Sequence, residues 1–509
     1  MPIPTRLGVL LVVMCTALAL VLGAGTSLAV ALPAIAADTG ATQTELSYVV
    51  NVYALVFAAL LLPAGIAADR FGRRPALVFG LVIFGAASLA SAFAADPTTL
   101  IVLRAVAGVG ATAVMPATLS VLVDAFPPER RAFAVSVWAG VSGAGSLVGL
   151  LLTGLLLEVF WWGSAQVVFG GIALALVAAV AMLVPTSRQP GLALDPVGST
   201  LVASGLAALV FGIIEGPERG WADAVTLTAL AGGAVLLALF VVHEWHAPAP
   251  LLDVRLFGRG LSTGSSLVFL QFFAASGFFL LAPQFLQSVL GRSTLEAVLG
   301  LLPLTAGIAP GSAMAPRLVA RFGPRVVGAA GMAAMAAGFV LLAVIGTGPY
   351  WHFGLSLALF GLGFGLAVTP GTTFIIDGLP ADRRTLASAV NDVTREVGAA
   401  LGGSLLASVL VTTYADSIAP ATRALPPEAA DAAGDGVAAA LGVADSLGPA
   451  GVALAEAARD AFTDGYRTAL LIGAAVLVLG AALCAVLAPR PRSPQPFQRA
   501  LTPDPLETP

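Results

Sequence analysis

The sequence predicts an all-α polytopic membrane protein with fourteen transmembrane helices. Of its 509 residues, 58% are hydrophobic and only 10% are charged, and the mean hydropathy is +0.96. A soluble protein of this size cannot bury so much apolar surface. The apolar residues fall into fourteen runs, most of them close to the roughly 20 residues that a helix needs to cross a bilayer. An internal repeat then divides these runs into two halves.

The fourteen runs follow one another along the chain, separated by polar connections. The first seven cover residues 7–35, 47–68, 76–95, 99–123, 132–157, 164–185 and 196–215. The second seven cover residues 224–243, 262–287, 295–319, 326–346, 351–376, 387–413 and 467–488. The first run is too long for a signal peptide and continues past any cleavage point, so we interpret it as helix 1.

The internal repeat has a spacing of 253 residues, and ten positions between Gly108 and Gly149 recur between Gly361 and Gly402. Helices 1–6 and 9–14 are therefore predicted to be duplicated halves, with helices 7 and 8 inserted between them. Paired halves of this kind are the usual build of secondary transporters. The predicted parts are a six-helix half over 1–188, the two inserted helices over 189–260, a second six-helix half over 261–489 and a tail over 490–509.

Charge placement predicts the orientation of the bundle. The chain has no lysine, and all 24 basic residues are arginine, which with abundant Ala and Gly is typical of a high-GC, actinobacterial genome. With both termini in the cytoplasm, seventeen arginines lie inside and five outside, in agreement with the positive-inside rule. The long connection 414–466 then lies outside, either as short amphipathic helices over the outer mouth or as a solvated loop.

Residue types also limit the chemistry. Without lysine there is no Walker A motif and no Schiff base, so the chain is not a P-loop ATPase. Cys15 and Cys484 lie inside apolar runs and predict no disulfide. His243, Glu244 and His246 are the one group that resembles a metal site. The two histidines could share a helix face, but no third ligand is in view, so we expect no metal site.

The segment from Gly65 to Arg74 joins the second and third runs and carries the most specific motif. Asp69 lies at a helix C-terminus, where a carboxylate opposes the helix dipole and needs a partner. The segment resembles G-x-L-A-D-R-x-G-R-R, the loop between helices 2 and 3 of major facilitator superfamily transporters, with Ala67 in the Leu position. The alternative is a positive-inside anchor that carries one acid.

The resemblance extends to the fourteen-helix drug:proton antiporter branch of that superfamily, of the actinobacterial type. Residues 28–33, 160–164 and 391–398 resemble segments of helices 1, 6 and 13 of the branch. It implies a major facilitator fold and a cytoplasmic gate in which Asp124 and Asp377 pair with Arg73 and its counterparts. The implied gating residues are Gly65, Asp69, Arg70, Gly72, Arg73, Arg74, Asp124, Arg130, Asp377 and Arg383.

The chain departs from the branch at two places. The antiporter motif G-P-x-x-G-G of helix 5 is reduced to 149–154, where the proline and one glycine are missing. Ala24 in helix 1 stands where many relatives carry an acid, and Asn51 in helix 2 stands where some relatives do. Both departures put antiport and a preference for dicationic substrates in question.

Ionisable residues inside spans cost about 2.5–3.5 kcal/mol each on insertion scales, so they are candidates for function. By resemblance, Arg104 takes part in proton coupling; the alternative is an arginine that reaches the outer interface. Asp392, Arg395 and Glu396 share one face of helix 13. This group either carries the coupled proton or forms a salt-bridge latch.

A cavity for amphipathic molecules needs aromatic and amide side chains on apolar helices. An amide that faces lipid would be unpaired, so glutamines inside spans are expected to face inward. The candidate cavity residues are Asn51, Tyr53, Met115, Trp138, Gln271, Phe272, Gln284 and Gln287.

These observations predict a secondary active transporter of the bacterial inner membrane, with both termini cytoplasmic, that exports lipophilic drugs or antibiotics by proton antiport. We expect no enzyme activity, no cofactor beyond the proton gradient, no nucleic-acid partner and a monomer in contact with lipid, small lipophilic substrates and protons. The alternatives are a dedicated natural-product exporter or a facilitator without proton coupling. A membrane enzyme or sensor is a more distant alternative.

Overall fold

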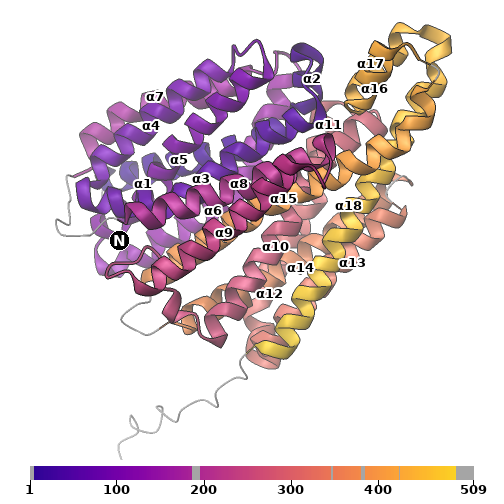
Figure 1. The fold of residues 1–509 in the computed structure, drawn as a ribbon. Coiled ribbons are helices and arrows are strands. Elements are labelled where there is room, and N and C mark those ends of the chain that lie inside the picture. Colours follow the sequence, from indigo (N-terminus) through magenta and orange to yellow (C-terminus); the bar gives the residue numbers. More distant parts are fainter. Residues whose placement is uncertain (1–4, 186–194, 346–347, 380–384, 424, 489–509) are drawn as a thin grey trace, which may run out of the picture.

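The computed structural model describes residues 5–185, 195–345, 348–379, 385–423 and 425–488. Its helices run side by side in one elongated bundle (Figure 1). The N-terminal half contains α1 (Thr5–Ser27), η1 (Leu28–Val30), α2 (Leu32–Thr39), α3 (Gln43–Phe71), α4 (Arg73–Ser91), α5 (Pro97–Ala125), α6 (Pro128–Leu157) and α7 (Ser164–Leu183). The inserted pair is α8 (Pro196–Arg219) and α9 (Ala224–His246).

The C-terminal half begins after a short linker with the 3-10 turn η2 (Val254–Leu256). It contains α10 (Arg259–Gln284), the π-helical turn η3 (Phe285–Val289), α11 (Thr294–Leu299), α12 (Leu302–Phe322), α13 (Pro324–Ile345), α14 (Tyr350–Asp377), α15 (Thr385–Thr422), α16 (Pro427–Gly434), α17 (Val437–Ser446), η5 (Gly448–Gly451) and α18 (Val452–Leu487). No strand occurs among the described residues.

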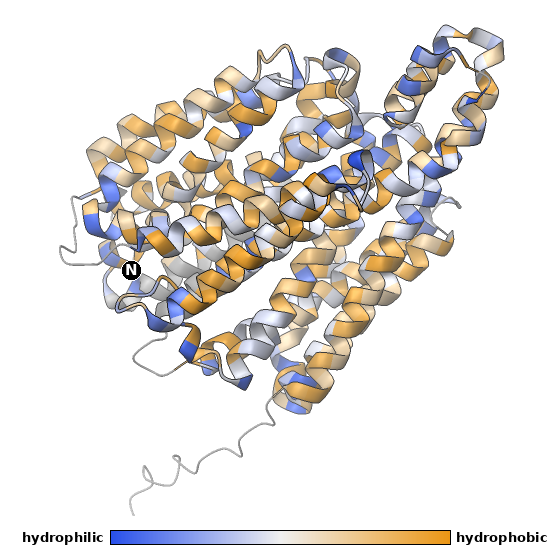
Figure 2. Cartoon of the chain, viewed as in Figure 1, coloured by the Kyte–Doolittle hydropathy of each residue, from blue (hydrophilic) through white to orange (hydrophobic). Residues whose placement is uncertain are grey.

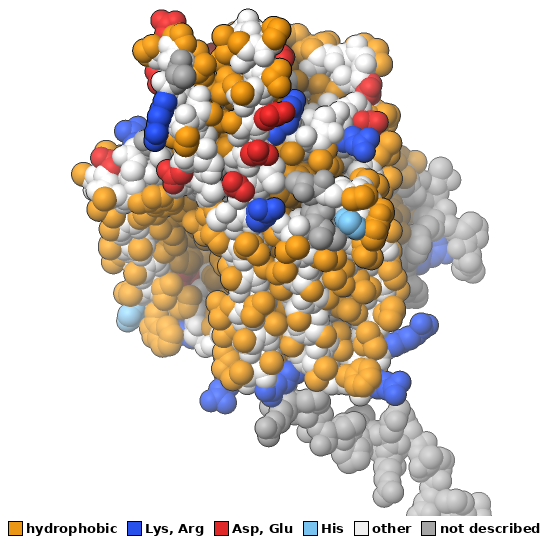
Figure 3. Space-filling view, turned by 90° about the vertical axis from the view of Figure 1, so that its right-hand side faces the viewer, with side chains coloured by type: hydrophobic (Ala, Val, Ile, Leu, Met, Phe, Trp, Pro, Cys, Tyr) orange, Lys and Arg blue, Asp and Glu red, His pale blue; other side chains and the backbone are white. Residues whose placement is uncertain are grey.

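Thirteen helices of the described part are long and apolar enough to cross a membrane. The helix α6 has 30 residues, enough to cross a bilayer, and its stretch Val148–Leu157 is apolar. Hydrophobic residues predominate along the helices (Figure 2). On the face seen in Figure 3, hydrophobic side chains cover the middle of the bundle and charged side chains gather towards its two ends. The prediction of a polytopic all-α membrane protein is therefore confirmed.

The same helix pairings occur in both halves. In the first half α1 packs on α6, α3 and α4 pack on α5, and α4 packs on α7; in the second half α10 packs on α15, α12 and α13 on α14, and α13 on α18. The repeated glycines allow these close contacts, since a Cβ at Gly149 would overlap the backbone of Gly23, and one at Gly402 would overlap that of Phe273. The sequence repeat thus marks the points where helices touch.

The inserted pair lies along the boundary between the halves. α8 packs on α9 and also contacts both α3 and α15 (Figure 1). Leu206, Val210 and Ile214 of α8 are buried together with Leu55 and Ala59 of α3. The inserted helices therefore cover the line where α3 of one half meets α15 of the other.

In two stretches the observed helices differ from those expected from the lengths of the apolar runs. The first run is interrupted, because α1 ends at Ser27 and a 3-10 turn leads into α2, which has a proline in its first turn. The connection 414–466 is mostly helical: α15 continues to Thr422, two short helices follow, and α18 begins at Val452. The amphipathic-helix interpretation of this connection is the one that the structure supports.

We call the end of the bundle that carries the start of α1 and the Asp69 segment the basic end, and the other end the far end. At the far end the main-chain N–H of Gln43 donates to the carbonyl of Asp435 at 2.9 Å, so the segment between α16 and α17 touches the start of α3. The start of α3 is fixed by a capping box of Thr42 and Glu45. This connection therefore contacts both halves of the protein.

Candidate functional site

The Asp69 segment forms an ion-pair chain at the basic end. Gly72 ends α3 with a φ of 116°, a backbone conformation that favours glycine, and so turns the chain directly into α4. The Arg73 guanidinium donates from Nε to Asp69 Oδ1 at 2.8 Å and also pairs with Asp124 at the end of α5. It donates to the carbonyl of Ser120 at 3.2 Å as well. Asp69 thus has the partner that its position at a helix end requires.

The other proposed gating residues lie around this chain. Gly65 of α3 faces Pro116 of α5, and a Cβ at Gly65 would meet that ring at 3.7 Å, an ordinary van der Waals contact. Arg70 lies over the Phe71 ring, while Arg74 and Arg130 are half-buried. Asp377 is exposed at the end of α14. Arg383 lies outside the described residues.

A cavity of about 860 Å³ lies between the two halves. Helices α1, α3, α5 and α6 form one wall, and α10, α12, α14 and α15 form the other. Its aromatic lining consists of Tyr53, Phe57, Trp138, Phe272, Phe279, Phe360 and Phe364. Its size and lining are typical of sites that bind small organic molecules.

One ionic cluster lines this otherwise apolar cavity. Arg395 lies 3.1 Å from Glu396 Oε1 and 3.8 Å from Asp392 Oδ1, and all three side chains belong to α15. The Arg395 guanidinium also stacks at 5.6 Å over Phe272 of α10 and comes within 4.0 Å of the Met115 sulfur of α5. With both acids ionised the cluster carries one net negative charge, so it is able to bind a proton or a cationic group.

Arg104 lies one layer behind the cavity wall. It is 1% exposed, so it does not reach the outer interface. Its guanidinium donates to the carbonyls of Val49 at 3.1 Å and Ala24 at 3.0 Å, and it lies 4.4 Å from the centre of the Tyr53 ring. Tyr53 itself lines the cavity. Arg104 therefore contacts the backbone at the position where many relatives carry the helix 1 acid.

Two further predicted residues line the cavity. Asn51 is 4% exposed and packs its amide against Gly403 of α15. Trp138 of α6 donates from Nε1 to the Thr118 hydroxyl at 3.1 Å. Both side chains are therefore held by contacts to neighbouring helices.

The structure places the remaining cavity candidates elsewhere. Met115 and the three glutamines are not among the residues that line the cavity. Gln271 donates to the carbonyl of Phe364 at 2.9 Å, within the contact between α10 and α14. Gln284 and Gln287 lie at the far end. The glutamines were expected to line the cavity, and that prediction is wrong: their amide groups bond within contacts between helices.

The far end is closed by bonds between the halves. Gln43 donates to Gln284 at 3.2 Å, and Gln287 donates to the carbonyl of Val30 at 3.0 Å. Glu158, the residue that directly follows α6, accepts hydrogen bonds from the Ser293 hydroxyl and from the main-chain N–H of Leu295 at the start of α11. The ring of hydrogen bonds separates the cavity from the far end of the bundle.

Sequence reasoning missed several residues of the cavity. Phe360 and Phe364 lie one turn apart on α14, which is a detectable spacing, but the same spacing is common on lipid-facing helices. Asn391 and Thr372 contribute polar groups from α15 and α14. Among the described residues no group of three His, Cys, Asp or Glu side chains lies close enough to hold a metal ion.

A duplicated bundle of membrane-spanning helices with a cavity between its halves defines a membrane transporter. The model of the Major Facilitator Superfamily matches residues 13–403. The chain belongs to the Major Facilitator Superfamily.

Several relatives match most of the chain. The multidrug efflux pump of Mycolicibacterium smegmatis is 35% identical over 94% of this chain and 95% of its own length. The puromycin resistance protein of Streptomyces alboniger is 35% identical over 80% of this chain and 82% of its own. The tetracenomycin C resistance and export protein of Streptomyces glaucescens is 31% identical over 82% and 77%.

A solved structure with the same fold is a bacterial homolog of the human lysosomal transporter Spinster, in an inward-facing and occupied conformation. It has a TM-score of 0.69 and 16% identity, and the match covers 95% of this chain and 97% of that one. At this identity the likeness bears on the fold alone.

Proposed function

We propose that this transporter exports lipophilic drugs or antibiotics across the bacterial cytoplasmic membrane in exchange for protons. The observation that carries the proposal is the cluster of Asp392, Arg395 and Glu396 in the wall of an aromatic cavity. The aromatic walls suit an amphipathic molecule, and the acids suit either its cationic group or a proton. The names of the relatives, which include a multidrug efflux pump and two resistance proteins, support the same function.

The coupling would come from competition for these acids. When substrate occupies the cluster, a proton has to leave, and when substrate departs, a proton can return. Arg395 would balance the charge that remains in the cavity between the two events. One proton that enters down a membrane potential of 100 mV supplies about 2.3 kcal/mol, which sustains a substrate gradient of some tens-fold.

Alternating access would move the two halves against each other. The far end is held by hydrogen bonds between the halves, and the ion-pair chain of Asp69, Arg73 and Asp124 belongs to the basic end. The arginine distribution supports a cytoplasmic basic end and cytoplasmic termini. The protein would work as a monomer, with the proton gradient as its energy source and no cofactor.

Purified protein in proteoliposomes tests the proposal. A pH gradient of either direction is imposed across the vesicle membrane, and movement of a panel of dyes and antibiotics is followed. We expect uphill substrate movement against the direction of proton flow, and proton movement that depends on substrate. Transport that ignores the pH gradient would contradict antiport and support the facilitator alternative.

A second candidate, export of one natural product, is favoured by the relatives from antibiotic producers, one of which is named as an export protein for tetracenomycin C. The same panel separates the two functions. Several chemically unrelated substrates would support multidrug export, whereas a single transported compound class would support a dedicated exporter.

A further inference from the structure

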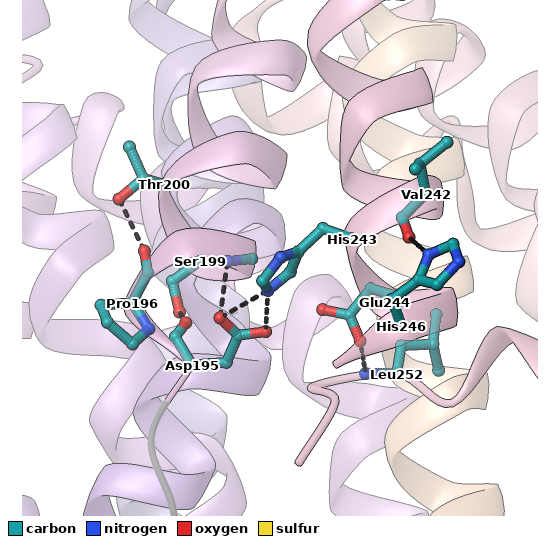
Figure 4. A network of polar contacts seen from close by, with 10 residues as sticks. Asp195, Pro196, Ser199, Thr200, Val242, His243, Glu244, His246 and Leu252 are labelled. Atoms are coloured by element: carbon teal, nitrogen blue, oxygen red, sulfur yellow. Dashed lines mark hydrogen bonds and ion pairs between the residues drawn. The ribbon is translucent and has the colours of Figure 1, made fainter. Parts of the chain in front are cut away.

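A buried acidic cluster lies outside the cavity, where α8 begins and α9 ends. Asp195 caps α8 by accepting the Gly198 N–H at 2.8 Å. The His243 ring of α9 lies with Nε2 at 3.0 and 2.9 Å from the two oxygens of the same carboxylate (Figure 4). Asp195 is 8% exposed, so this contact is largely shielded from solvent.

Glu244, the next residue of α9, is completely buried beside this contact. Its Oε2 accepts the main-chain N–H of Leu252 at 2.9 Å, and its Oε1 has no hydrogen-bond partner among the described residues (Figure 4). A buried carboxylate oxygen without a donor is unfavourable, and more so when it is charged.

The two carboxylates are close neighbours. A Cβ at Gly198 would lie 2.5 Å from Asp195 Oδ2 and 2.5 Å from Glu244 Oε1, so these oxygens are at most 5.0 Å apart. Two carboxylates at such a distance favour a state in which one of them is protonated. Among the described residues no three His, Cys, Asp or Glu side chains are placed so that they could hold a metal ion together, and a proton is the ligand that fits two neighbouring carboxylates.

We propose that Asp195 and Glu244 share one proton and, with His243, form a proton-binding site separate from the substrate cavity. Asp195 directly follows the segment 186–194, which comes from the N-terminal half. Leu252 belongs to the linker that leads from α9 into α10 of the C-terminal half. The site therefore ties the start of α8 to the linker that follows α9, and its proton controls the strength of this tie.

The other charged groups near the site are engaged elsewhere. On α9, His246 is exposed and its Nδ1 bonds to the Val242 carbonyl at 2.8 Å. In the linker, Asp253 and Arg255 pair with each other. At the basic end of the adjacent α3, Asp69 pairs with Arg73 of α4 and Arg70 lies over Phe71.

The charged groups described on α15, which also packs against α8, are Asp392, Arg395, Glu396 and Asp416. The first three line the cavity. Asp416 lies near the far end of α15.

Protonation and deprotonation have opposite effects on the tie. With the shared proton present, only one of the two carboxylates is charged. When the proton leaves, two buried negative charges repel each other, and Glu244 is driven from Leu252. We therefore expect the contact between Glu244 and Leu252 to weaken as the pH rises.

Hydrogen exchange of the full-length protein in nanodiscs tests the proposal. Exchange of the peptide that contains Leu252 is measured between pH 5.5 and 8 and corrected by the exchange of the same peptide when unstructured. We expect the protection factor of the parent to fall at least about tenfold over this range, since local opening sets protection. Glu244→Gln, which keeps a neutral acceptor for Leu252, should hold protection within about twofold at all pH values.

Gly198→Ala provides the opposite change. Alanine favours a helix, but its Cβ separates the two carboxylates, so protection should already be low at pH 5.5. Asp253→Asn is the matched control, because it changes an acid of the same linker outside the cluster and should keep the pH dependence of the parent. Flat protection in the parent, or equal pH dependence in the parent and Glu244→Gln, would overturn the proposal. Should Glu244→Gln fail to fold, parent-like protection in Gly198→Ala at pH 5.5 would also overturn it.

Discussion

At the residue scale, the charges at the substrate cavity and directly behind its wall have different surroundings. Asp392, Arg395 and Glu396 line the cavity and are in reach of a solute. Arg104 is enclosed by backbone carbonyls and the Tyr53 ring. The first set is therefore suited to exchange a ligand, whereas Arg104 fixes the helices that form the wall.

This difference leads to a prediction about coupling. Asp392→Asn and Glu396→Gln remove the ionisable group but keep the shape, so uphill, pH-driven transport should be lost while substrate exchange is kept, because exchange needs no net proton step. Arg104→Ala should impair both activities, since it removes two helix-to-helix hydrogen bonds. Both activities are measured in proteoliposomes.

The control for the acid variants is Asp223→Asn, since Asp223 caps α9 at the far end and asparagine is an equally good cap. If both acid variants concentrate substrate under a pH gradient as the parent does, the cluster on α15 is only a structural latch.

A second prediction concerns Asp69. In addition to Arg73, the positive N-terminus of α15 is a candidate partner for this carboxylate when the basic end closes, near Ala387 and Ser388, whose side chains lie outside the described residues. Asp69→Asn should lower transport at least about tenfold, since a weakened latch shifts the balance between two states. Expression and membrane insertion should match the parent, as judged by size-exclusion chromatography of a fluorescent fusion.

Asp124→Asn removes the other partner of Arg73 and should have an effect of the same direction. Parent-like transport in the Asp69 variant would show that the latch is not needed.

The sequence predicted that charged, aromatic and amide side chains lie inside the bundle, but it predicted less well which of them line the cavity. The spacing of Asp392, Arg395 and Glu396 predicted that they share one face of their helix, α15, and all three line the cavity. Gln271, Gln284 and Gln287 were expected beside them because an amide avoids lipid. Helical spacing does not tell a cavity from a contact between helices, and these amides bond to neighbouring helices.

At the element scale, the contact between α1 and α6 depends on glycine. The reduced antiporter motif keeps Gly149, which allows the backbone of Gly23 to approach. Gly149→Ala should destabilise the protein by about 1–3 kcal/mol, because an added methyl group has no space in a packed contact. Gly171→Ala on α7 is the control, since a Cβ there meets nothing within 4 Å. Thermal unfolding in detergent measures both, and equal midpoints would contradict the prediction.

Element boundaries were predictable only where hydropathy and helix propensity agree. Most spans were recognisable from apolar length, but the turn at Leu28–Val30 is apolar and gave no such signal. Conversely, α18 begins at Val452, well before the predicted span at residue 467, because alanine favours helix even where charged residues interrupt the apolar pattern. Hydropathy therefore identifies the segment of a helix that crosses the bilayer, but not the segment that extends beyond it into solvent.

At the scale of the whole molecule, the predicted orientation can be tested by labelling. Cys15 and Cys484 are replaced by alanine, and single cysteines are introduced at exposed positions. A cysteine at Phe71 should resist an impermeant maleimide in intact cells, whereas one at Asp431 should react, if the basic end is cytoplasmic. The reverse pattern would invert the orientation, and both sites should react after the cells are opened.

The closed far end leads to a prediction about movement. A cleavable cross-linker between cysteines at Gln43 and Gln284 joins the two halves where they are hydrogen-bonded, so transport should fall at least about tenfold and recover on reduction, because one of two states is locked. The matched pair Arg292 and Glu296 lies within one half, so its cross-linking should leave transport near the parent level. Full transport by the bridged first pair would contradict alternating access through this end.

The position of the inserted pair has a consequence for solutes that dissolve in lipid. Tyr48 of α3 donates to Glu215 of α8 at 2.8 Å, and Ser408 of α15 donates to the carbonyl of Ile213, so one flank is sealed to both halves. Other cavity walls come from α6 and α12, which have no extended contact with the inserted pair among the described residues. A molecule that diffuses within a leaflet therefore meets a protein with unequal sides, and we expect its capture to depend on the direction from which it arrives.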